Sequence, residues 1–360
     1  MTRSTVCRPD TTWAGTNWNC GSGGGHICST HQHGHLSGDP IITTEAMRMG
    51  LLAGRVAILT GGAGSLGSAM SRLLAAEGAS VVVNDVNIAR AQKIVDKIVA
   101  AGGNAVADDS DVSTMAGGSA VVQRALDQFG TVDVLVLLAG QVAIKSITKL
   151  TEEDWDRVIG IHMKGHFSVL KAALPTMIDK KYGRVIAVSS VDGTIGDAYM
   201  SPYCAAKAGI LGFARAAAIE LDEHGITVNT ICPSGIPGDL GPIATKLAGP
   251  PAGNAPLVAY LASEESGWLN GHVFDVSGSG RIGLYPPYVP SRLVSKEGGY
   301  TVEELRNVVP ALFEPTYTIE PRQRPRLLPK EGESEDRLPK GFSAIFAEVT
   351  AGAGVVPQTD

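Results

Sequence analysis

The stretch from Arg55 to Asp85 constrains the fold of this chain more than any other. It begins with the apolar run RVAILT, continues through the glycine-rich segment GGAGSLG and the helical pattern SAMSRLLAAEG, and ends with a second apolar run, ASVVVND. A buried strand, a glycine turn, a helix and a second strand closed by an acidic residue form the order of a dinucleotide-binding unit. Asp85 stands eighteen residues after Gly67, which suits that unit.

The glycine turn and Asp85 also predict which dinucleotide is bound. Glycines let the backbone approach a pyrophosphate, and the free amides and dipole at the start of the following helix favour its negative charge. The Asp85 carboxylate can accept hydrogen bonds from both hydroxyls of an adenosine ribose and would repel a 2′-phosphate. No lysine or arginine lies within residues 61–68, and Asp85 is followed by Val86 and Asn87 rather than by a base. We therefore predict NAD, rather than NADP, as the cofactor.

The alternation of strands and helices continues along the chain. The strand patterns are NAVA, VDVLVLL, RVIAVS, ITVNTI and HVFDVS. Helical patterns separate them, among them a long one from Thr151 to about Met177 that opens with a capping box formed by Thr151 and Asp154. This order predicts an α/β fold in one domain over residues 51–284, a Rossmann-type doubly wound parallel sheet of about seven strands that binds ligands at the carboxyl ends of its strands.

Two segments flank this domain. Residues 1–50 are polar and glycine-rich, which predicts a disordered leader. The leader has a cluster of possible metal ligands: Cys20, His26, Cys28, His31, His33 and His35. Because their spacing matches no recognised zinc pattern, we predict no metal site. In the C-terminal extension, residues 285–360, Thr301 and Glu304 predict the cap of a short helix within TVEELRNVV, and the remainder is expected to be partly disordered.

A second feature, the run VSSVDGTIGDAYMSPYCAAKAGI, carries groups suited to carbonyl chemistry. Tyr203 and Lys207 are four residues apart in a helical segment and therefore share a face. The Lys207 ammonium can then favour phenolate and lower the Tyr203 pKa, so that the phenol exchanges a proton with an alcohol or a ketone. Ser190 lies at the end of the strand RVIAVS, where its hydroxyl could hold the substrate oxygen.

With these residues identified, residues 51–284 resemble the short-chain dehydrogenase/reductase family, in its single-domain Tyr-x-x-x-Lys branch. The resemblance rests on Thr60-Gly61 with Gly67, Asp111-Val112, Ala139-Gly140, Ser190, the motif YCAAK from Tyr203 to Lys207, Asn229, and Pro233 with Ile236. It implies that Tyr203 is the general acid/base, that Ser190 binds the reacting oxygen, and that Lys207 also holds the nicotinamide ribose. The cofactor-binding residues that it implies are Gly61, Ser65, Leu66, Gly67, Asp85, Asp111, Val112, Ala139, Gly140, Tyr203, Lys207, Pro233 and Ile236.

Three departures from the family pattern affect the predicted site. Ser65 replaces the middle glycine of the cofactor turn, which leaves the local conformation of that turn open. Leu137 and Leu138 replace two asparagines, so two amides that steady the central strands are lost. His162 stands where the family usually carries a proton-relay asparagine. Imidazole titrates near neutral pH and can bridge a water to Lys207, so His162 is either a catalytic relay substitute or a packed core histidine.

Composition and charge limit the class of partner. The net charge is -6, the pI is about 5.8 and no basic cluster is present, which argues against nucleic acid. No apolar run approaches the roughly 20 residues needed to cross a bilayer. The five cysteines do not resemble a disulfide framework. A cytoplasmic protein with a small-molecule partner is expected.

These observations leave several functions open. The first is an NAD-dependent oxidoreductase that interconverts a secondary alcohol and a ketone, and family habit suggests a homodimer or a homotetramer. A 3-hydroxyacyl thioester dehydrogenase is an alternative within the family, since His162 and the NDV ending of the second strand are similar to that group. Hydroxysteroid and terpene alcohol dehydrogenases are further alternatives. A catalytically idle, nucleotide-binding scaffold subunit is the alternative from another class. The segment 233–256 is rich in proline and glycine where the family forms a substrate lid, so something else, such as the extension, could complete the substrate site.

Overall fold

The computed structural model describes residues 50–234, 249–286, 301–302 and 305. Its core is one eight-stranded sheet in the order β3-β2-β1-β4-β5-β6-β7-β8. The strands are β1 (Val56–Thr60), β2 (Ser80–Asn84), β3 (Asn104–Asp108), β4 (Val134–Leu137), β5 (Gly183–Val188), β6 (Ile226–Ser234), β7 (Val273–Ser277) and β8 (Ile282–Tyr285). Strands β1 to β7 are parallel to their neighbours, and β8 pairs antiparallel with β7. The predicted doubly wound, mostly parallel Rossmann-type sheet is confirmed, with β8 as an edge strand that the sequence did not predict.

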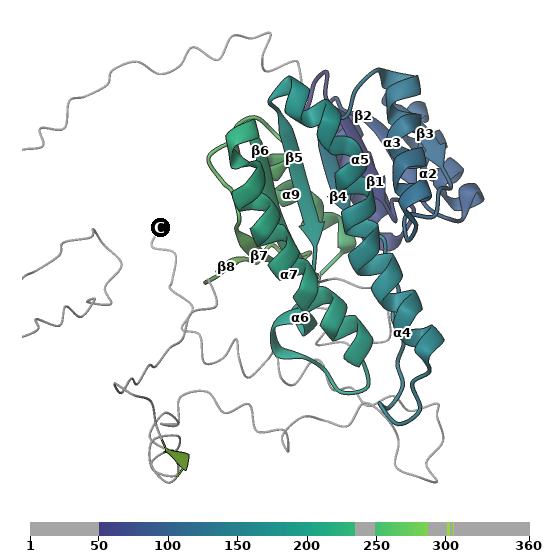
Figure 1. Cartoon of the computed structure of the whole chain (residues 1–360). Helices are drawn as coiled ribbons and strands as arrows, with labels where there is room; N and C mark the ends of the chain where they lie inside the picture. The colour runs from purple at the N-terminus through teal and green to yellow at the C-terminus, as the bar shows by residue number, and fades with distance from the viewer. Residues whose placement is uncertain (1–49, 235–248, 287–300, 303–304, 306–360) are drawn as a thin grey trace, which may run out of the picture. The chain divides into compact units, whose positions relative to one another are not determined.

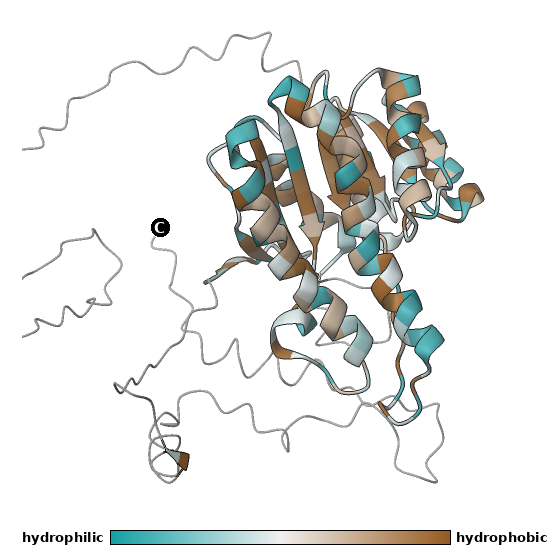
Figure 2. Cartoon of the chain, in the orientation of Figure 1, coloured by the Kyte–Doolittle hydropathy of each residue, from teal (hydrophilic) through white to brown (hydrophobic). Residues whose placement is uncertain are grey.

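Helices cover both faces of the sheet (Figure 1). The α-helices are α1 (Ser65–Ala76), α2 (Ile88–Ala100), α3 (Met115–Phe129), α4 (Glu152–Ile159), α5 (Gly165–Lys180), α6 (Asp192–Ile195), α7 (Ser201–Leu221) and α9 (Ala255–Leu261). The shorter helical turns are η1 (Gly160–Lys164, a π-helix), η2 (Asp222–His224) and η3 (Pro251–Asn254). One core cluster packs α1, α2 and α9 on the sheet, and the other packs α3, α5 and α7 on its opposite face. The strands are apolar while polar residues lie on the outer helix surfaces (Figure 2), as the buried runs predict.

The helix predicted from Thr151 to about Met177 is confirmed in extent but not in regularity. The Thr151 hydroxyl accepts from the Asp154 amide at 3.1 Å, and the Asp154 carboxylate accepts from the Thr151 amide, so the capping box is present. The helix is interrupted by the π-helical turn η1 before it continues as α5. A π-turn inserts one extra residue into the helix, and such turns are frequent at functional sites.

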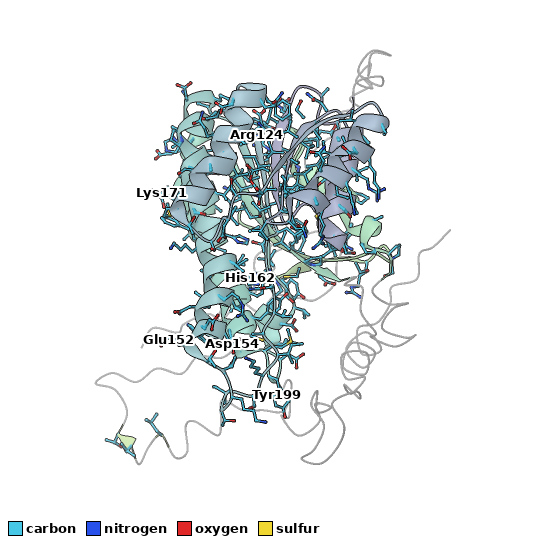
Figure 3. The ribbon with its side chains drawn as sticks, turned by 90° about the vertical axis from the view of Figure 1, so that its right-hand side faces the viewer. Arg124, Glu152, Asp154, His162, Lys171 and Tyr199 are labelled. Carbon is cyan, nitrogen blue, oxygen red and sulfur yellow. The ribbon has the colours of Figure 1, made fainter. Side chains whose placement is uncertain are left out.

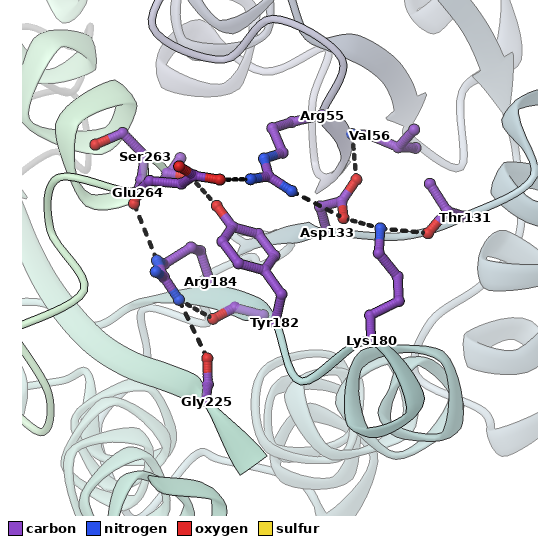
Figure 4. A network of polar contacts seen from close by, with 12 residues as sticks. Arg55, Val56, Thr131, Asp133, Lys180, Tyr182, Arg184, Gly225, Ser263 and Glu264 are labelled. Atoms are coloured by element: carbon purple, nitrogen blue, oxygen red, sulfur yellow. Dashed lines mark hydrogen bonds and ion pairs between the residues drawn. The ribbon is translucent and has the colours of Figure 1, made fainter.

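The amino ends of the central strands are joined by a charged network (Figure 4). The fully buried carboxylate of Asp133 accepts from the Val56 amide at 2.9 Å and pairs with the ammonium of Lys180. Arg55 lies 3.8 Å from the same carboxylate. The network therefore attaches strand β1 to strand β4 at their amino ends, opposite the glycine turn.

The same network continues to β5 through an aromatic ring. Tyr182 lies between two guanidinium groups, 3.9 Å from that of Arg55 and 4.4 Å from that of Arg184. Arg184 is buried, and its guanidinium donates to the carbonyl oxygens of Ser263 at 2.9 Å and of Gly183 at 2.9 Å. The stacked guanidinium groups and their hydrogen bonds therefore stabilise the amino ends of the strands. The candidate site lies at the opposite, carboxyl ends.

Two predictions lie outside the described residues. The first is the leader with its cysteine and histidine cluster, and the second is most of the extension after residue 286. Of the predicted helix in the extension, the structure describes a bond from the Leu305 amide to the Thr301 carbonyl at 3.1 Å. Among the described residues no helix combines the length and apolarity needed to cross a bilayer, and none of the acidic, histidine and cysteine side chains form a group suited to a metal ion. The division into three segments stays a prediction.

Candidate active site

The carboxyl ends of β1, β2 and β4 surround a cavity of about 460 Å³. The strand order reverses between β1 and β4, which makes this the topological switch point where open α/β sheets bind ligands. The structure brings to this cavity Gly61, Ser65, Leu66, Gly67, Asp85, Asp111, Val112, Ala139 and Gly140. All of these were predicted from the sequence as cofactor-binding residues.

The glycine turn leaves space that only a backbone can approach. Helix α1 begins at Ser65, with Gly64 as its extended N-cap, so the Ser65 substitution is accommodated as the first helical residue. A Cβ atom at Gly67 would stand 2.2 Å from the carbonyl oxygen of Gly61. Gly67 is thus required for the close contact between the helix and the turn. A tight turn at the amino end of a helix fits the pyrophosphate of a dinucleotide.

Beside Asp85, the cavity is lined by Asn84, which was not among the residues predicted from the sequence. Asn84, the buried last residue of β2, donates from its side chain to the Asp108 carboxylate at 2.7 Å and to the Ser110 carbonyl at 2.9 Å. Asn84 and Ser110 both line the cavity. Asn84 therefore fixes the ends of β2 and β3 beside Asp85. A polar residue at the end of the apolar run ASVVVN, directly before Asp85, was the sequence signal that could have identified Asn84.

A basic residue, Arg90, also lines the cavity. Arg90 lies outside the glycine turn and beyond the two residues that follow Asp85. It projects from the first turn of α2 and donates to the carbonyl oxygen of Ala63 at 3.2 Å.

Thr60 compensates for the amides lost at Leu137 and Leu138. Its buried hydroxyl oxygen accepts from the backbone amide of Leu138 at 3.0 Å and from that of Ala139 at 3.1 Å. The end of β4 is therefore attached to the end of β1 through a side chain of β1.

Ser190, Tyr203 and Lys207 are all buried, at 8%, 8% and 3% exposure. The Ser190 hydroxyl donates to the Asp192 carboxylate at 3.0 Å and accepts from the Asp192 amide at 3.2 Å, which orients it at the end of β5. The Lys207 ammonium donates to the Val188 carbonyl at 2.6 Å and lies 5.5 Å from the centre of the Tyr203 ring. The structure thus brings the predicted catalytic residues together at the ends of β5 and α7.

The protonation of these groups differs from the sequence prediction. Burial raises the pKa of Tyr203 to about 12, and hydrogen bonding with Ser190 opposes that rise only in part. Burial also lowers the pKa of Lys207 to about 8. The predicted lowering of the Tyr203 pKa by Lys207 is therefore not produced by the described residues, because desolvation of the phenolate is the larger effect.

His162 lies on the π-turn η1 and is 2% exposed. A Cβ at Gly140 would stand 2.1 Å from the His162 Cε1 atom, so the imidazole rests directly on that glycine. Its Nε2 lies 2.9 Å from the Gln141 carbonyl oxygen and 3.2 Å from the Gln141 amide. Its ring meets the Tyr203 ring edge to face at 5.3 Å between centres.

The structure corrects the predicted titration of His162. Burial, and secondly the charge of Lys207, lower its pKa to about 3 rather than leaving it near neutral pH. The Nδ1 atom of His162 is buried and has no hydrogen-bond partner among the described residues. A neutral ring with one nitrogen unpaired can take part in a hydrogen-bonded relay without itself becoming charged.

Two loops form a wall beside Tyr203. Ala143, in the loop after β4, packs in one apolar cluster with Tyr203. The Lys145 amide donates to the Tyr199 carbonyl at 2.9 Å, and Tyr199 has the left-handed φ of 66°. The Lys145 ammonium holds the pKa of Asp154 well below its usual range. In Figure 3, Asp154 and Tyr199 lie toward the same end of the molecule, beyond His162. A positive φ is strained for a bulky residue, so the hydrogen bond from the Lys145 amide helps to hold Tyr199 in this conformation.

The remaining predicted residues are further along the chain. Pro233 lies near the end of β6, in register with Val276 of β7. Ile236 lies outside the described residues, as does most of the short segment where the family forms its substrate lid. Tyr203, Lys207 and Pro233 are not among the residues that line the cavity.

Comparison with known proteins identifies what this chain is similar to. The profile of the short chain dehydrogenase family matches residues 55–244. The chain is 34% identical over 237 residues to the (2S)-[(R)-hydroxy(phenyl)methyl]succinyl-CoA dehydrogenase subunit BbsD of Thauera aromatica, covering 62% of this chain and 95% of that protein. It is 35% identical over 240 residues to the 3-oxoacyl-[acyl-carrier-protein] reductase FabG of Vibrio cholerae, covering 63% and 97%.

A longer protein and a solved structure also match. The chain is 38% identical over 247 residues to the peroxisomal multifunctional enzyme type 2 of Mus musculus. The aligned region covers 64% of this chain but only 32% of that enzyme. A crystal structure of a short chain dehydrogenase from Mycobacterium avium superposes with a TM-score of 0.67 at 36% identity, covering 73% of this chain and 96% of that one.

Proposed function

This chain belongs to the short-chain dehydrogenase family, and we propose that it is an NAD-dependent oxidoreductase that interconverts a secondary alcohol and a ketone. The observation that carries the proposal is the burial of Ser190, Tyr203 and Lys207 together, at the same sheet edge as a cavity built for a dinucleotide. Members of the family are oxidoreductases that act on CH–OH groups with a nicotinamide cofactor.

In the proposed reaction Tyr203 moves the proton. A nicotinamide cofactor held by the residues that line the cavity would supply the hydride acceptor or donor for the carbinol carbon. The Ser190 hydroxyl, oriented by Asp192, holds the substrate oxygen beside the phenol. As the phenolate, Tyr203 accepts the hydroxyl proton during oxidation, and as the phenol it returns that proton to the substrate oxygen during reduction. Hydrogen bonding with Ser190 opposes in part the rise in the Tyr203 pKa that burial imposes, and the Lys207 ammonium lies 5.5 Å from the centre of the phenol ring.

His162 is the proposed relay behind Lys207. Because its pKa is about 3, the ring is neutral at working pH. With its proton on Nε2 it donates to the Gln141 carbonyl, and Nδ1 then remains a hydrogen-bond acceptor for a water that connects to Lys207. A buried nitrogen without a partner costs free energy, and a water that relays to Lys207 would remove that cost at Nδ1.

The preference for NAD rests on Asp85. Its carboxylate lines the cavity at the end of β2 and accepts from the Asn87 amide at 3.1 Å, which fixes its direction. A carboxylate there binds ribose hydroxyls and repels a 2′-phosphate. Asp85→Ala is expected to relax the preference, and a wild-type protein that prefers NADPH would contradict it.

A second candidate is a 3-hydroxyacyl thioester dehydrogenase. Two relatives support it by name, since one acts on a substituted succinyl-CoA and the other on a 3-oxoacyl group carried by acyl carrier protein. Both substrates are secondary alcohols or ketones near a thioester. This candidate needs the same catalytic residues and differs in the substrate alone. We also propose that the protein is a homodimer or a homotetramer, which sedimentation of the full chain would test. Its proposed location is the cytoplasm.

The experiment that tests the function is a substrate panel. Secondary alcohols of steroid, terpene and 3-hydroxyacyl-CoA type are mixed with the full chain and NAD or NADP, and the appearance of reduced cofactor absorbance is followed. Turnover of at least one class with NAD is expected. Silence across the panel, together with intact NAD binding, would instead support an idle nucleotide-binding subunit.

A further inference from the structure

Asp192 is a buried acidic residue directly beside the proposed catalytic groups. It is the first residue of α6 and is 6% exposed. A Cβ at the next residue, Gly193, would stand 2.6 Å from the Lys207 carbonyl carbon, so α6 packs closely on α7. A hydroxyl or an amide could orient Ser190 as well as a carboxylate does, and a buried charge costs more free energy than either. The charge of Asp192 therefore requires a further explanation.

The hydroxyl of Ser190 has one proton and two groups that can accept it. It donates to the Asp192 carboxylate at 3.0 Å, and its oxygen accepts from the Asp192 amide at 3.2 Å. The same hydroxyl also hydrogen-bonds with Tyr203, and a proton donated to the phenolate would favour its ionised form. Because a charged acceptor forms the stronger hydrogen bond, Asp192 competes with the phenolate for the Ser190 proton.

Titratable groups face Tyr203 from four elements: Asp192 on α6, Cys204 and Lys207 on α7, Cys232 on β6 and His162 on η1. Burial raises the pKa of both thiols, that of Cys232 to about 12, and lowers that of His162 to about 3, so these three groups are neutral near neutral pH. Lys145 and Asp154, on the loop and the helix that pack against the same apolar cluster, pair with each other. Within the described part of the chain, the charges that act on the phenol are then those of Lys207 and Asp192.

These two charges act on the phenol in opposite directions. The Lys207 ammonium, 5.5 Å from the ring centre, favours the phenolate. Burial lowers the pKa of Lys207 to about 8, so its charge is lost as the pH rises toward the range in which a phenol titrates. The negative charge of Asp192 remains in that range. Burial is the largest cause of the raised Tyr203 pKa, and the charge of Asp192 adds to it.

We propose that Asp192 is a positioning residue whose carboxylate, acting through Ser190 and through its charge, keeps Tyr203 in the phenol form and thereby favours reduction of a ketone near neutral pH. Tyr203 donates its proton to the carbonyl oxygen while the carbonyl carbon accepts a hydride from a reduced nicotinamide. The C=O π bond and the Tyr203 O–H bond break, a C–H and an O–H bond form, and Tyr203 is left as the phenolate until solvent returns a proton. The ketone is reduced and the nicotinamide is oxidised. Alcohol oxidation needs the phenolate and therefore a higher pH. This inference rests on the proposed function.

The test follows the absorbance of the Tyr203 phenolate while the full chain is titrated to alkaline pH without substrate or cofactor. Subtracting the same protein with Tyr203→Phe cancels the other tyrosines, and circular dichroism checks the fold at each pH. Asp192→Asn keeps the size of the side chain and removes its charge, so it is expected to lower the midpoint of Tyr203 by about one unit or more. Below both midpoints its phenolate signal should exceed that of the wild type about tenfold.

Controls separate the charge from the fold. Asp192→Glu keeps the charge and should reproduce the wild-type titration. Asp179→Asn removes the same charge from an exposed position at the end of α5 and should change nothing. If Asp192→Asn does not fold, Asp192→Ser makes the same test, because its hydroxyl can pair with Ser190 without a charge. Equal Tyr203 signals with and without the carboxylate, or no signal from either protein, would overturn the inference.

The pH dependence of turnover distinguishes this role from a purely structural one. On the alcohol and ketone that the substrate panel identifies, Asp192→Asn should move the alkaline rise of oxidation and the alkaline loss of reduction down by about one pH unit or more. A residue that only orients Ser190 would lower turnover without moving either profile, and that result would also overturn the inference. A panel without any turnover would contradict the proposed function, whereas the absorbance titration would still decide the role of Asp192.

Discussion

Two buried neutral histidines predict that the protein loses stability in mild acid. His162 and His166 are each 2% exposed, and burial lowers the pKa of each from 6.5 to about 3. In the unfolded chain both rings bind a proton near their ordinary value, so the unfolded state takes up more protons than the folded state between about pH 6.5 and 3. Stability contributed by the neutral rings is therefore complete above pH 6.5 and is lost as the pH falls toward 3.

The magnitude follows from the two pKa values. At pH 5 each histidine costs about 2 kcal/mol, since one pKa unit corresponds to about 1.4 kcal/mol and about 1.5 units separate pH 5 from the unfolded pKa. Both together remove about 4 kcal/mol of an unfolding free energy that is typically about 5–15 kcal/mol. The lowered pKa of Asp154 affects stability only as the pH falls toward and below the ordinary carboxyl value of 3.8, and so below pH 5.

The assay is urea unfolding followed by circular dichroism at several values between pH 7 and 5. His162→Asn should remove about half of the pH dependence, because it deletes one of the two groups while keeping a polar side chain. His224→Asn is the control for the loss of an imidazole that is not buried. A wild-type unfolding free energy that stays flat over this range, or an unchanged slope in His162→Asn, would refute the reasoning.

Two other substitutions test the turn and the base of the sheet. Gly67→Ala should raise the NAD dissociation constant more than tenfold, because its Cβ would stand 2.2 Å from the Gly61 carbonyl oxygen, whereas Gly212→Ala, with nothing within 4 Å, should leave binding unchanged. Calorimetry measures both, and equal binding by the two variants would contradict the role of the turn. Asp133→Ala should cost about 1–3 kcal/mol in urea unfolding, since it leaves a buried strand amide without its acceptor, while Glu264→Gln, at an exposed partner of the same network, should cost less than about 1 kcal/mol. A loss at Glu264 as large as at Asp133 would contradict the account of the network.

The sequence predicted the order of strands and helices because each element carries its own periodic signal. The apolar runs of β1, β4 and β5 are fully buried, as their composition requires. The capping box at Thr151 and the acidic end of β2 at Asp85 are local signals, and both lie where they were expected. The residues predicted to hold the cofactor face one cavity because parallel strands bring their carboxyl ends to one edge.

What the sequence did not predict depends on three-dimensional surroundings. The π-turn at His162 has no periodic signal, since one inserted residue leaves the helical pattern on both sides intact. The shifts in the pKa values of Tyr203 and His162 come from burial, which depends on residues far along the chain. Arg90 reaches the cavity through a long side chain that extends back to a turn twenty-seven residues earlier.

The most direct test of the proposed chemistry compares Tyr203→Phe with the wild type on whichever secondary alcohol the panel identifies. The substitution removes only the phenolic oxygen from a buried ring that packs against His162 and Ala143. Turnover with NAD should fall by at least about a thousandfold, the scale of general acid/base catalysis, while the NAD dissociation constant measured by calorimetry changes by less than about threefold. Retained turnover in Tyr203→Phe would contradict the assignment of Tyr203 as the proton-transferring group.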